Sequence, residues 1–242
     1  MIICHRINTV AGLSTVPRHF GVEIDVRHDA RSGRLYLSHD PVSAPAQAED
    51  LEHYLSTFQH AFIIFNIKEA GTEQTCINLA NQYGIPRSSY FLLDVEFPYL
   101  YRACGFADRA AIRAGSVDRD RHVHEIAVRY SEAEPLAQAQ ALCGLVDWVW
   151  IDTNTTLPID GESDQSLADF RRCLVCPERW GRPQDIEAYA ARLRDLGFAL
   201  DAVMTALPHA ARWERAGLFR SNTPASFPSQ KPRAAAATRA TP

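Results

Sequence analysis

The chain lacks the features that would direct it to a membrane, to nucleic acid or out of the cell. No apolar run reaches the length that a membrane-spanning helix needs. The formal net charge of the 242 residues is −4, so no basic field calls for nucleic acid or an anionic membrane. The first residues enter an apolar segment without a basic stretch or a cleavage site. We therefore expect a cytoplasmic protein that acts on a small molecule, with no nucleic-acid partner and no integral membrane segment.

Cysteines are also too scattered for a disulfide framework. The six cysteines belong to a long chain without a secretory signal. Cys173 and Cys176 have the spacing of half a zinc knuckle, but no second pair accompanies them. In an extended strand these two side chains would face opposite sides. We expect both to be small buried side chains and disfavour a metal or redox role.

Short apolar segments alternate with helix-like segments along most of the chain, which is 46% hydrophobic and 22% charged. This alternation is typical of a parallel sheet covered by helices. The expected strands are residues 1–5, 21–26 with 35–38, 61–67, 90–95, 109–113 or 126–130, 147–153, 173–176 and 201–207. The expected helices are residues 48–56, 73–83, 133–142, 164–171 and 185–196. Gly84, Gly144 and Gly197 lie where helix C-caps are expected.

This rhythm of about eight strands in about 220 residues predicts a single α/β domain with the (β/α)8 TIM-barrel fold. We expect it to span residues 1–220, with a doubly wound open sheet as the alternative. Residues 221–242 consist mainly of Ser, Pro, Ala and Thr, with Phe227 as the only aromatic residue. Such a segment cannot bury enough apolar area to offset the entropy of ordering, so we expect a disordered C-terminal tail.

Two carboxylates lie side by side on the second expected strand. Glu23 and Asp25 alternate with Val22, Ile24 and Val26, so the acidic side chains share one face and the apolar side chains the other. Neighbouring carboxylates repel each other unless a cation or strong hydrogen-bond donors compensate them. The strand therefore predicts a site that holds a cation or a cluster of donors.

Other polar side chains stand at the ends of nearby strands. In a barrel of this kind the carboxyl ends of all strands meet at one mouth, where reactive groups gather. His5 and Arg6 end the first strand, Asn66 and Lys68 end the third, and His39 follows the short strand after the second. Imidazole titrates near neutral pH, so two histidines beside paired carboxylates and cations predict metal-assisted chemistry on a phosphate group.

These residues resemble the motifs of the glycerophosphodiester phosphodiesterase family. The family belongs to a larger group that includes phosphatidylinositol-specific phospholipases C and sphingomyelinase D-like enzymes. Beyond residue 68 only the strand–helix rhythm agrees, with a faint similarity at residues 204–208. The motifs that carry the resemblance are His5-Arg6, Asn8-Thr9, Glu23-x-Asp25-Val26, His39-Asp40 and Ile67-Lys68.

The resemblance implies a metal-dependent phosphodiesterase with a TIM-barrel fold. Its substrate would be a small glycerophosphodiester, cleaved by hydrolysis or, where a neighbouring hydroxyl attacks, by cyclisation. The metal would be Mg2+ or Ca2+, because the ligands are oxygen atoms. The implied roles are general acid–base catalysis for His5 and His39, binding of the divalent cation for Glu23 and Asp25, and binding of the phosphate oxygens for Arg6 and Lys68.

Two departures from the family pattern concern the phosphate and metal sites. The family has glycine after the His-Arg pair, whereas this chain has Ile7 and a shortened stretch before Asn8. The third strand of the family carries Glu-x-Lys, whereas this chain has Asn66 before Lys68. Asn66 can bind a metal through its amide oxygen but brings no charge. Asp94, at the end of the fourth strand, is the expected additional ligand.

Polar residues near these motifs also have ordinary structural interpretations. We expect Asn8 and Thr9 to cap the first helix and Asp40 to form a turn. Arg129 and Asp152 stand near later strand ends, where we weigh contact with the substrate and a structural role equally.

Two other functions stay open. A phospholipase C-like or sphingomyelinase D-like lyase would use the same groups, since selection of the headgroup depends on later loops. A catalytically inactive barrel that binds a phosphorylated ligand is favoured by Asn66 and by the short first loop. The two histidines and the paired carboxylates favour an enzyme, because a pure binding protein needs no acid–base pair.

Overall fold

The computed structural model describes residues 1–220, which form an α/β fold with a mostly parallel sheet. The expected tail, residues 221–242, lies outside the described residues. The strands are β1 (Ile2–Cys4), β2 (Gly21–His28), β3 (Leu35–Leu37), β4 (Glu49–Asp50), β5 (Phe62–Ile67), β6 (Tyr90–Leu93), β7 (Ala127–Tyr130), β8 (Trp148–Ile151), β9 (Arg171–Val175) and β10 (Ala202–Thr205). The α-helices are α1 (Val10–Leu13), α2 (Leu51–Thr57), α3 (Glu73–Gln82), α4 (Phe97–Ala103), α5 (Arg109–Arg113), α6 (Leu136–Leu142), α7 (Gly161–Ser166), α8 (Ile186–Asp195) and α9 (Ala210–Ala216).

Parallel pairing follows the order β6-β5-β2-β1-β10-β9-β8-β7. β3 and β4 form an antiparallel extension on β2. The other edge of β6 contacts the segment before β7. There Leu92 of β6 forms a parallel bridge with Ile126, and the amide of Leu92 donates to the carbonyl of Glu125 at 2.9 Å. Because the paired strands run parallel, their carboxyl ends lie along one edge.

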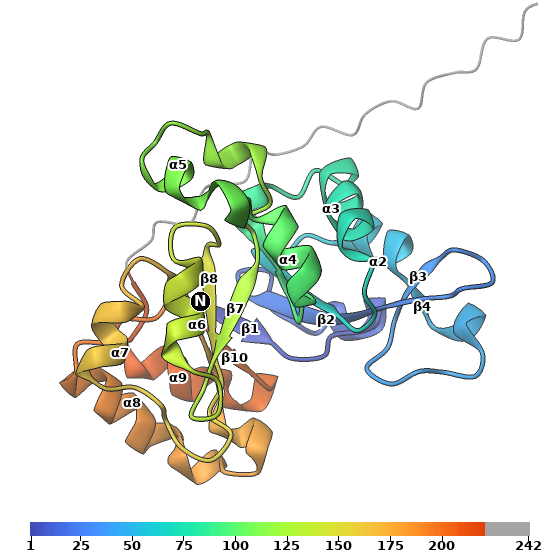
Figure 1. Cartoon of the computed structure of the whole chain (residues 1–242). Helices are drawn as coiled ribbons and strands as arrows, with labels where there is room; N and C mark the ends of the chain where they lie inside the picture. Colours follow the sequence, from blue (N-terminus) through green and yellow to red (C-terminus); the bar gives the residue numbers. More distant parts are fainter. Residues whose placement is uncertain (221–242) are drawn as a thin grey trace, which may run out of the picture.

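Helices cover the sheet on more than one side (Figure 1). In this view α2, α3 and α4 lie to the upper right of the strands, whereas α7, α8 and α9 lie to the lower left. The extension formed by β3 and β4 projects to the right, beyond the end of β2. No helix among the described residues is long and apolar enough to cross a bilayer.

Alternate side chains of the strands form two apolar clusters. One cluster joins strand residues such as Val22 and Ile24 to helix residues such as Tyr54. The buried members of the second cluster, among them Phe91 and Trp148, all come from strands. One face of each strand packs against helices, and the other face packs against side chains of the other strands. Because successive side chains alternate between these two faces, only every second residue of a strand points to the side of the second cluster.

β2 passes very close to its neighbours at Gly21. A Cβ atom at this position would lie 2.4 Å from Cδ1 of Ile3 and 2.9 Å from Cβ of Phe62. The Ile3 side chain can turn away, but Cβ and the carbonyl oxygen of Phe62 at 2.9 Å and 3.0 Å belong to β5, so a larger residue would push β5 outward. Glu23 and Asp25 occupy the next two positions on the same face of β2. The close packing at Gly21 therefore holds this part of β2 against β5, next to the two carboxylates.

Most of the expected strands are confirmed to within a few residues. Of the two alternatives for one strand, residues 109–113 form helix α5 and residues 126–130 contain β7. The expected helix over residues 164–171 was placed too late, because α7 ends at Ser166 and β9 begins at Arg171. The expectation for the cysteines is also confirmed: Cys173 and Cys176 are free, buried and members of opposite clusters.

Candidate active site

Glu23 and Asp25 project from β2 toward the face that carries the strand-only cluster. They are almost inaccessible, with 1% and 0% of their surface exposed. Val22, Ile24 and Val26 belong to the opposite cluster, which confirms the alternation expected from the sequence. Ionised groups away from water are strongly destabilised unless they are paired, so the partners of these carboxylates define the site.

Glu23 is held by two donors and lies near an imidazole. The backbone amide of Arg6 donates to Oε2 at 2.7 Å, and the side-chain amide of Asn66 donates to Oε1 at 2.7 Å. Nε2 of His5 lies 3.8 Å from Oε2. Burial, followed by the charge of Asp25, raises the pKa of Glu23 from 4.5 to about 7, while the two hydrogen bonds act in the opposite direction.

Asp25 is bound by Asn8 and Lys68. Nδ2 of Asn8 donates to Oδ2 at 2.8 Å, and Oδ1 of Asn8 accepts from the amide of Asp25 at 2.8 Å. Nζ of Lys68 lies 3.2 Å from Oδ1, although that buried oxygen accepts no hydrogen bond of good geometry. The expectation that Asn8 caps helix α1 is wrong, because its side chain is committed to Asp25. Thr9 caps α1 by accepting from the amide of Gly12 at 3.0 Å, and the amide of Val10 at the start of α1 donates to Oε2 of Glu49 at 2.9 Å.

His5 directly follows β1 and is largely buried, with 12% of its side chain exposed. Burial lowers the pKa of His5 from 6.5 to about 3, and the charges of Arg179, Arg6, His39 and Lys68 act in the same direction. The imidazole is therefore neutral near pH 7, and it is a weak base until a bound anion offsets the charges of the surrounding cations. The cations around it also favour the approach of an anion.

His39 reaches the same region on the antiparallel extension. β3 pairs with β2 with Leu37 opposite Val26, and the amide of Ser38 donates to the carbonyl of Asp25 at 3.0 Å. His39 follows with 38% of its side chain exposed, and its Nδ1 lies 3.0 Å from Oδ1 of Asp40. The charge of His39 is one of the lesser causes of the lowered pKa of His5.

Ion pairs continue from Asp25 across the ends of β5, β6, β7 and β8. Lys68 also lies 3.8 Å from Oδ2 of Asp94. Arg129 binds Asp94 Oδ1 through Nε at 2.7 Å and through Nη2 at 2.6 Å, and its Nη1 binds Asp152. Burial raises the pKa of Asp152 from 3.8 to about 6, and Arg129 opposes this shift. Asp94, expected as a metal ligand, is thus paired with two cations.

Two residues of the site have a backbone conformation that favours glycine. The φ angles are 53° at Arg6 and 58° at Asp94. Non-glycine residues in this region are uncommon, and those that persist are found preferentially at functional sites. At Arg6 this conformation accompanies the hydrogen bond from its amide to Glu23, while the residue as a whole is exposed.

Three residues outside the expected set of catalytic, substrate-binding and metal-binding residues also hold this end of the strands. Asn8 binds Asp25, Arg27 binds the segment that carries His39, and Glu178 joins the ends of β9 and β10 by accepting from the amide of Ala206 at 2.7 Å. A signal for Arg27 was present, since it follows Asp25 by two residues and therefore shares its face of β2. The partners of Asn8 and Glu178 are distant in sequence, and no local pattern indicates them.

Three observations bear on a metal ion. Among residues 1–220, no three His, Cys, Asp or Glu side chains are grouped as in a preformed metal site. Two buried oxygens, Asp25 Oδ1 and Asn66 Oδ1, accept no hydrogen bond. The network described above has an excess of two negative charges when fully ionised, since it contains the carboxylates of Glu23, Asp25, Asp94 and Asp152 but only the cations of Lys68 and Arg129. A cation held by two carboxylates, an amide oxygen and water would match the free oxygens and the charge, and Mg2+ is often bound in this way.

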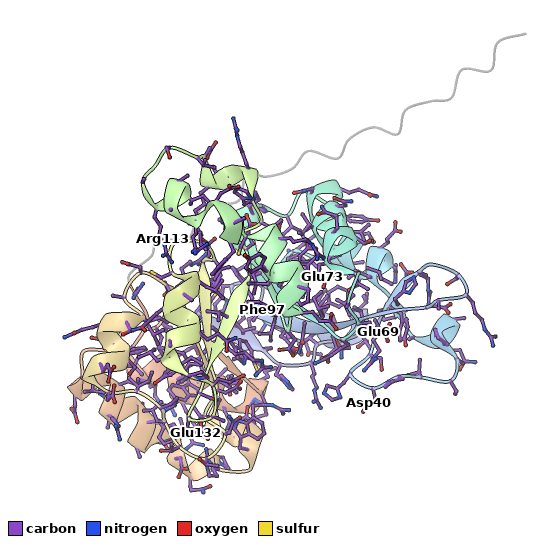
Figure 2. The ribbon with its side chains drawn as sticks, viewed as in Figure 1. Asp40, Glu69, Glu73, Phe97, Arg113 and Glu132 are labelled. Carbon is purple, nitrogen blue, oxygen red and sulfur yellow. The ribbon has the colours of Figure 1, made fainter. Side chains whose placement is uncertain are left out.

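Two surface pockets lie away from these groups. One, of about 470 Å3, is lined by residues from α1 and by the segment before β5, including His60. The other, of about 390 Å3, adjoins α6 and is lined by Glu132, Glu134 and Asp160 among others. Glu132, one of the residues that line this pocket, lies in the lower left part of the molecule in Figure 2. Neither pocket is lined by the two histidines or the paired carboxylates.

No protein-family model matches the chain, and a search of curated proteins finds no significant match. The arrangement of groups at the strand ends therefore carries the functional argument.

Proposed function

We propose that the chain is a metal-dependent phosphodiesterase that cleaves a glycerophosphodiester-like substrate, with His5 and His39 as the acid–base pair. One observation carries this proposal. Glu23 and Asp25 are buried side by side and held by donors, His5 lies 3.8 Å from Glu23, and His39 follows a segment hydrogen-bonded to Asp25. Two imidazoles beside a compensated pair of carboxylates have the composition that phosphodiester cleavage requires.

We further infer that the eight parallel strands close into a (β/α)8 barrel. Support comes from the unbroken pairing order from β6 to β7 and from the bridge between Leu92 and Ile126, which joins the two ends of that order. The cluster whose buried members all come from strands is the packed interior that such a barrel would have. The mouth at the carboxyl ends would then bring together residues from β1, β2, β5, β6, β7 and β8.

The proton transfers divide naturally between the two imidazoles. His5 is neutral near pH 7 and would accept the proton of the attacking water or substrate hydroxyl. His39, oriented by Asp40, would donate a proton to the departing alkoxide. If a cyclic phosphate forms first, its hydrolysis reverses the two roles and returns both rings to their starting states.

Arg6 and Lys68 would bind the phosphoryl oxygens. Negative charge on these oxygens increases in the transition state, and fixed cations that face them lower the barrier. Lys68 is held in place by Asp25 and Asp94, whereas Arg6 is exposed at the same end of the strands.

The residues present fit a divalent cation, Mg2+ or Ca2+. Glu23, Asp25 and Asn66 would hold it, with Asp94 as a further candidate. When bound, the cation neutralises charge on the phosphoryl oxygens. Two features support this assignment: Oδ1 of Asn66 and Oδ1 of Asp25 accept no hydrogen bond, although Lys68 pairs with the latter, and the network has an excess of negative charge.

The test is turnover by metal-stripped protein resupplied with Mg2+, Ca2+ or Mn2+, using a glycerophosphodiester and a chromogenic phosphodiester. Turnover should require metal and should fall about 10²- to 10⁴-fold in His5→Ala and His39→Ala. His19→Ala is the matched control. His19 is exposed and lies just before the amino end of β2, whereas the proposed site lies at the carboxyl ends of the strands. Full activity of His39→Ala would contradict the proposal. Phosphorus NMR of the products separates hydrolysis from the cyclic product of a phospholipase C-like or sphingomyelinase D-like lyase.

A catalytically inactive barrel that binds a phosphorylated ligand is the second candidate. It is favoured by the pairing of Asp94 with Lys68 and Arg129, which engages a carboxylate that a metal would need. Calorimetric titrations with Mg2+ and with inorganic phosphate distinguish the two candidates. Phosphate binding without metal binding or turnover would favour the inactive barrel.

A further inference from the structure

We infer that Arg27 is a positioning residue that fixes the His39 segment for proton transfer. This inference rests on the proposed function, in which His39 is the general acid. Arg27 follows Asp25 by two residues on β2, so it projects from the same face of the strand at a point nearer to its carboxyl end. One strand therefore carries both the paired carboxylates and the group that holds the histidine.

The contacts of Arg27 are directed at the backbone of the His39 segment. Nη2 donates to the carbonyl of His39 at 2.7 Å, and Nε lies 3.2 Å from the carbonyls of both Ser38 and His39. Nη1 pairs with Oε1 of Glu69 at 2.8 Å, and Oε2 of Glu69 accepts from the amide of His28 at 3.0 Å. Only 12% of the Arg27 side chain is exposed, so water competes little for these bonds.

His39 needs such a restraint because of its place in the chain. β3 ends at Leu37, and the regular pairing with β2 stops there. The ring of His39 is bound to Asp40, but that carboxylate has 86% of its side chain exposed. An exposed ion pair holds its geometry weakly. The planar, five-donor guanidinium of Arg27 is the stronger constraint, because it binds two successive carbonyls at once.

The position of Arg27 between the His39 segment and the end of β5 is also informative. Glu69 follows Lys68 at the end of β5, so Arg27 ties the His39 segment to both strands that supply the carboxylates, the amide and the ammonium. Figure 2 shows Glu69 and Asp40 on the same side of the molecule, below helices α2 and α3. A shift of this segment would change the distance between the proton donor and the phosphate. Misplacement by about 1 Å can slow an enzyme about 100-fold.

The chain offers a matched control in Arg113. Its Nη2 donates to the carbonyls of Ala141 and Cys143 at 3.0 Å and 2.9 Å, and its Nε donates to that of Cys143 at 3.2 Å. Both guanidinium groups bind two backbone carbonyls, but Arg113 is exposed, whereas Arg27 is largely buried and paired with Glu69. Arg113 joins α5 to the end of α6 and contacts no residue of the candidate site.

The first test compares Arg27→Ala with Arg113→Ala. Both variants should melt at a lower temperature, but only Arg27→Ala should lose kcat, by about 100-fold, with KM little changed. Added guanidinium ion should restore part of the activity of Arg27→Ala, whereas ammonium ion should not. Equal losses of activity in the two variants would overturn the inference, because they would indicate general destabilisation.

The second test does not depend on turnover. Protein labelled with carbon-13 at the histidine rings is compared by NMR, with His39→Ala assigning the His39 signal. This signal should shift or broaden in Arg27→Ala and stay unchanged in Arg113→Ala. An unchanged signal in Arg27→Ala would overturn the inference. If Arg27→Ala does not fold, Arg27→Lys keeps the charge but loses the two-carbonyl geometry, and the same displacement of the signal is expected.

The two proposals fail in different ways. Full activity of His39→Ala would refute the role of His39 and with it the proposed function. An inactive His39→Ala beside a fully active Arg27→Ala would refute the positioning role alone.

Discussion

The ammonium of Lys68 lies 3.2 Å from Oδ1 of Asp25, a carboxylate with no exposed surface. The same ammonium lies 3.8 Å from Asp94, so one cation serves carboxylates on two strands. A cation in this position compensates buried charge in the free protein and faces the proposed substrate site. Stability and activity should therefore both depend on it.

Replacement of Lys68 by methionine keeps an unbranched side chain, one atom shorter, and removes its charge. Asp25 then loses its cation, and we expect the free energy of unfolding to fall by about 3 kcal/mol, at the lower limit for buried pairs because Lys68 is partly exposed. Turnover should fall about 10²- to 10³-fold. Urea unfolding and steady-state kinetics measure the two effects. Unchanged stability in Lys68→Met would show that the pair does not compensate Asp25.

Asn8 and Thr9 are adjacent, but the structure gives them different partners. Asn8→Ala removes two hydrogen bonds to Asp25, and we expect metal affinity or activity to fall about 10- to 100-fold, as when a metal ligand loses its orienting partner. Thr9→Ala removes only the cap of α1 and should lower the free energy of unfolding by about 1 kcal/mol. Metal titration and kinetics of both variants provide the comparison. Equal losses of activity would contradict the assignment of Asn8 to Asp25.

Replacement of Asn66 by aspartate should have opposite effects on the metal-free and metal-bound proteins. In the metal-free protein it adds a third buried carboxylate and removes the donor to Glu23, so we expect a loss of about 3 kcal/mol in unfolding free energy. The added charge should tighten binding of Mg2+ about tenfold, since affinity for hard cations rises with ligand charge. Melting curves without Mg2+ test the expected loss of stability, and melting curves with Mg2+ test the expected gain in metal affinity. Asn78→Asp, an exposed change of equal charge, is the control. Equal melting shifts on addition of Mg2+ in both variants would exclude Asn66 from the metal site.

The pair of His124 and Asp147, away from the proposed site, should govern part of the pH dependence of stability. Nδ1 of His124 lies 2.9 Å from Oδ2 of Asp147. The hydrogen bond to Asp147 raises the pKa of His124 above 6.5. Burial acts to raise the pKa of Asp147. The hydrogen bond with His124 and the charge of Arg119 outweigh burial and lower this pKa below 3.8.

The signs follow from linkage between proton binding and folding. Stabilisation by His124 is complete below pH 6.5 and is lost as the pH rises through its raised pKa in the folded protein. Stabilisation by Asp147 is present above pH 3.8 and is lost as the pH falls through its lowered pKa. Wild type should therefore exceed His124→Gln in unfolding free energy by more at about pH 5 than at about pH 8. Urea unfolding at both pH values measures this difference, and an equal difference would contradict it.

Local periodicity was sufficient to place the central groups. Alternation along β2 predicted the shared face of Glu23 and Asp25. The prediction holds because the side-chain period of a strand depends only on its extended backbone. The same period brings Asn66 to Glu23 and Lys68 to Asp25 at the end of β5. The preference for an α/β fold followed from the spacing of apolar segments in the same way.

The partners of these groups did not follow from local pattern. The bonds from Asn8 to Asp25 and from Arg129 to Asp94 join residues far apart in sequence, and they depend on strand order and on the exact end of each strand. Helix α4 was missed for a different reason. Its aromatic residues Phe97, Tyr99 and Tyr101 favour strands in isolation, whereas packing in the folded chain selects a helix.

The antiparallel extension has a consequence for how long the protein would stay functional. Within residues 1–220, β3 is paired only with β2 and β4, and β4 only with β3. Detachment of the His39 segment would break the pairing of β3 and the bonds from Arg27, but it would leave the parallel strands with all of their mutual pairing. Inactivation on mild heating, or after proteolytic nicking between β2 and β3, would precede the main melting transition. The time for which such an enzyme stays active would depend on how long β3 stays attached to β2, and not on the stability of the parallel sheet.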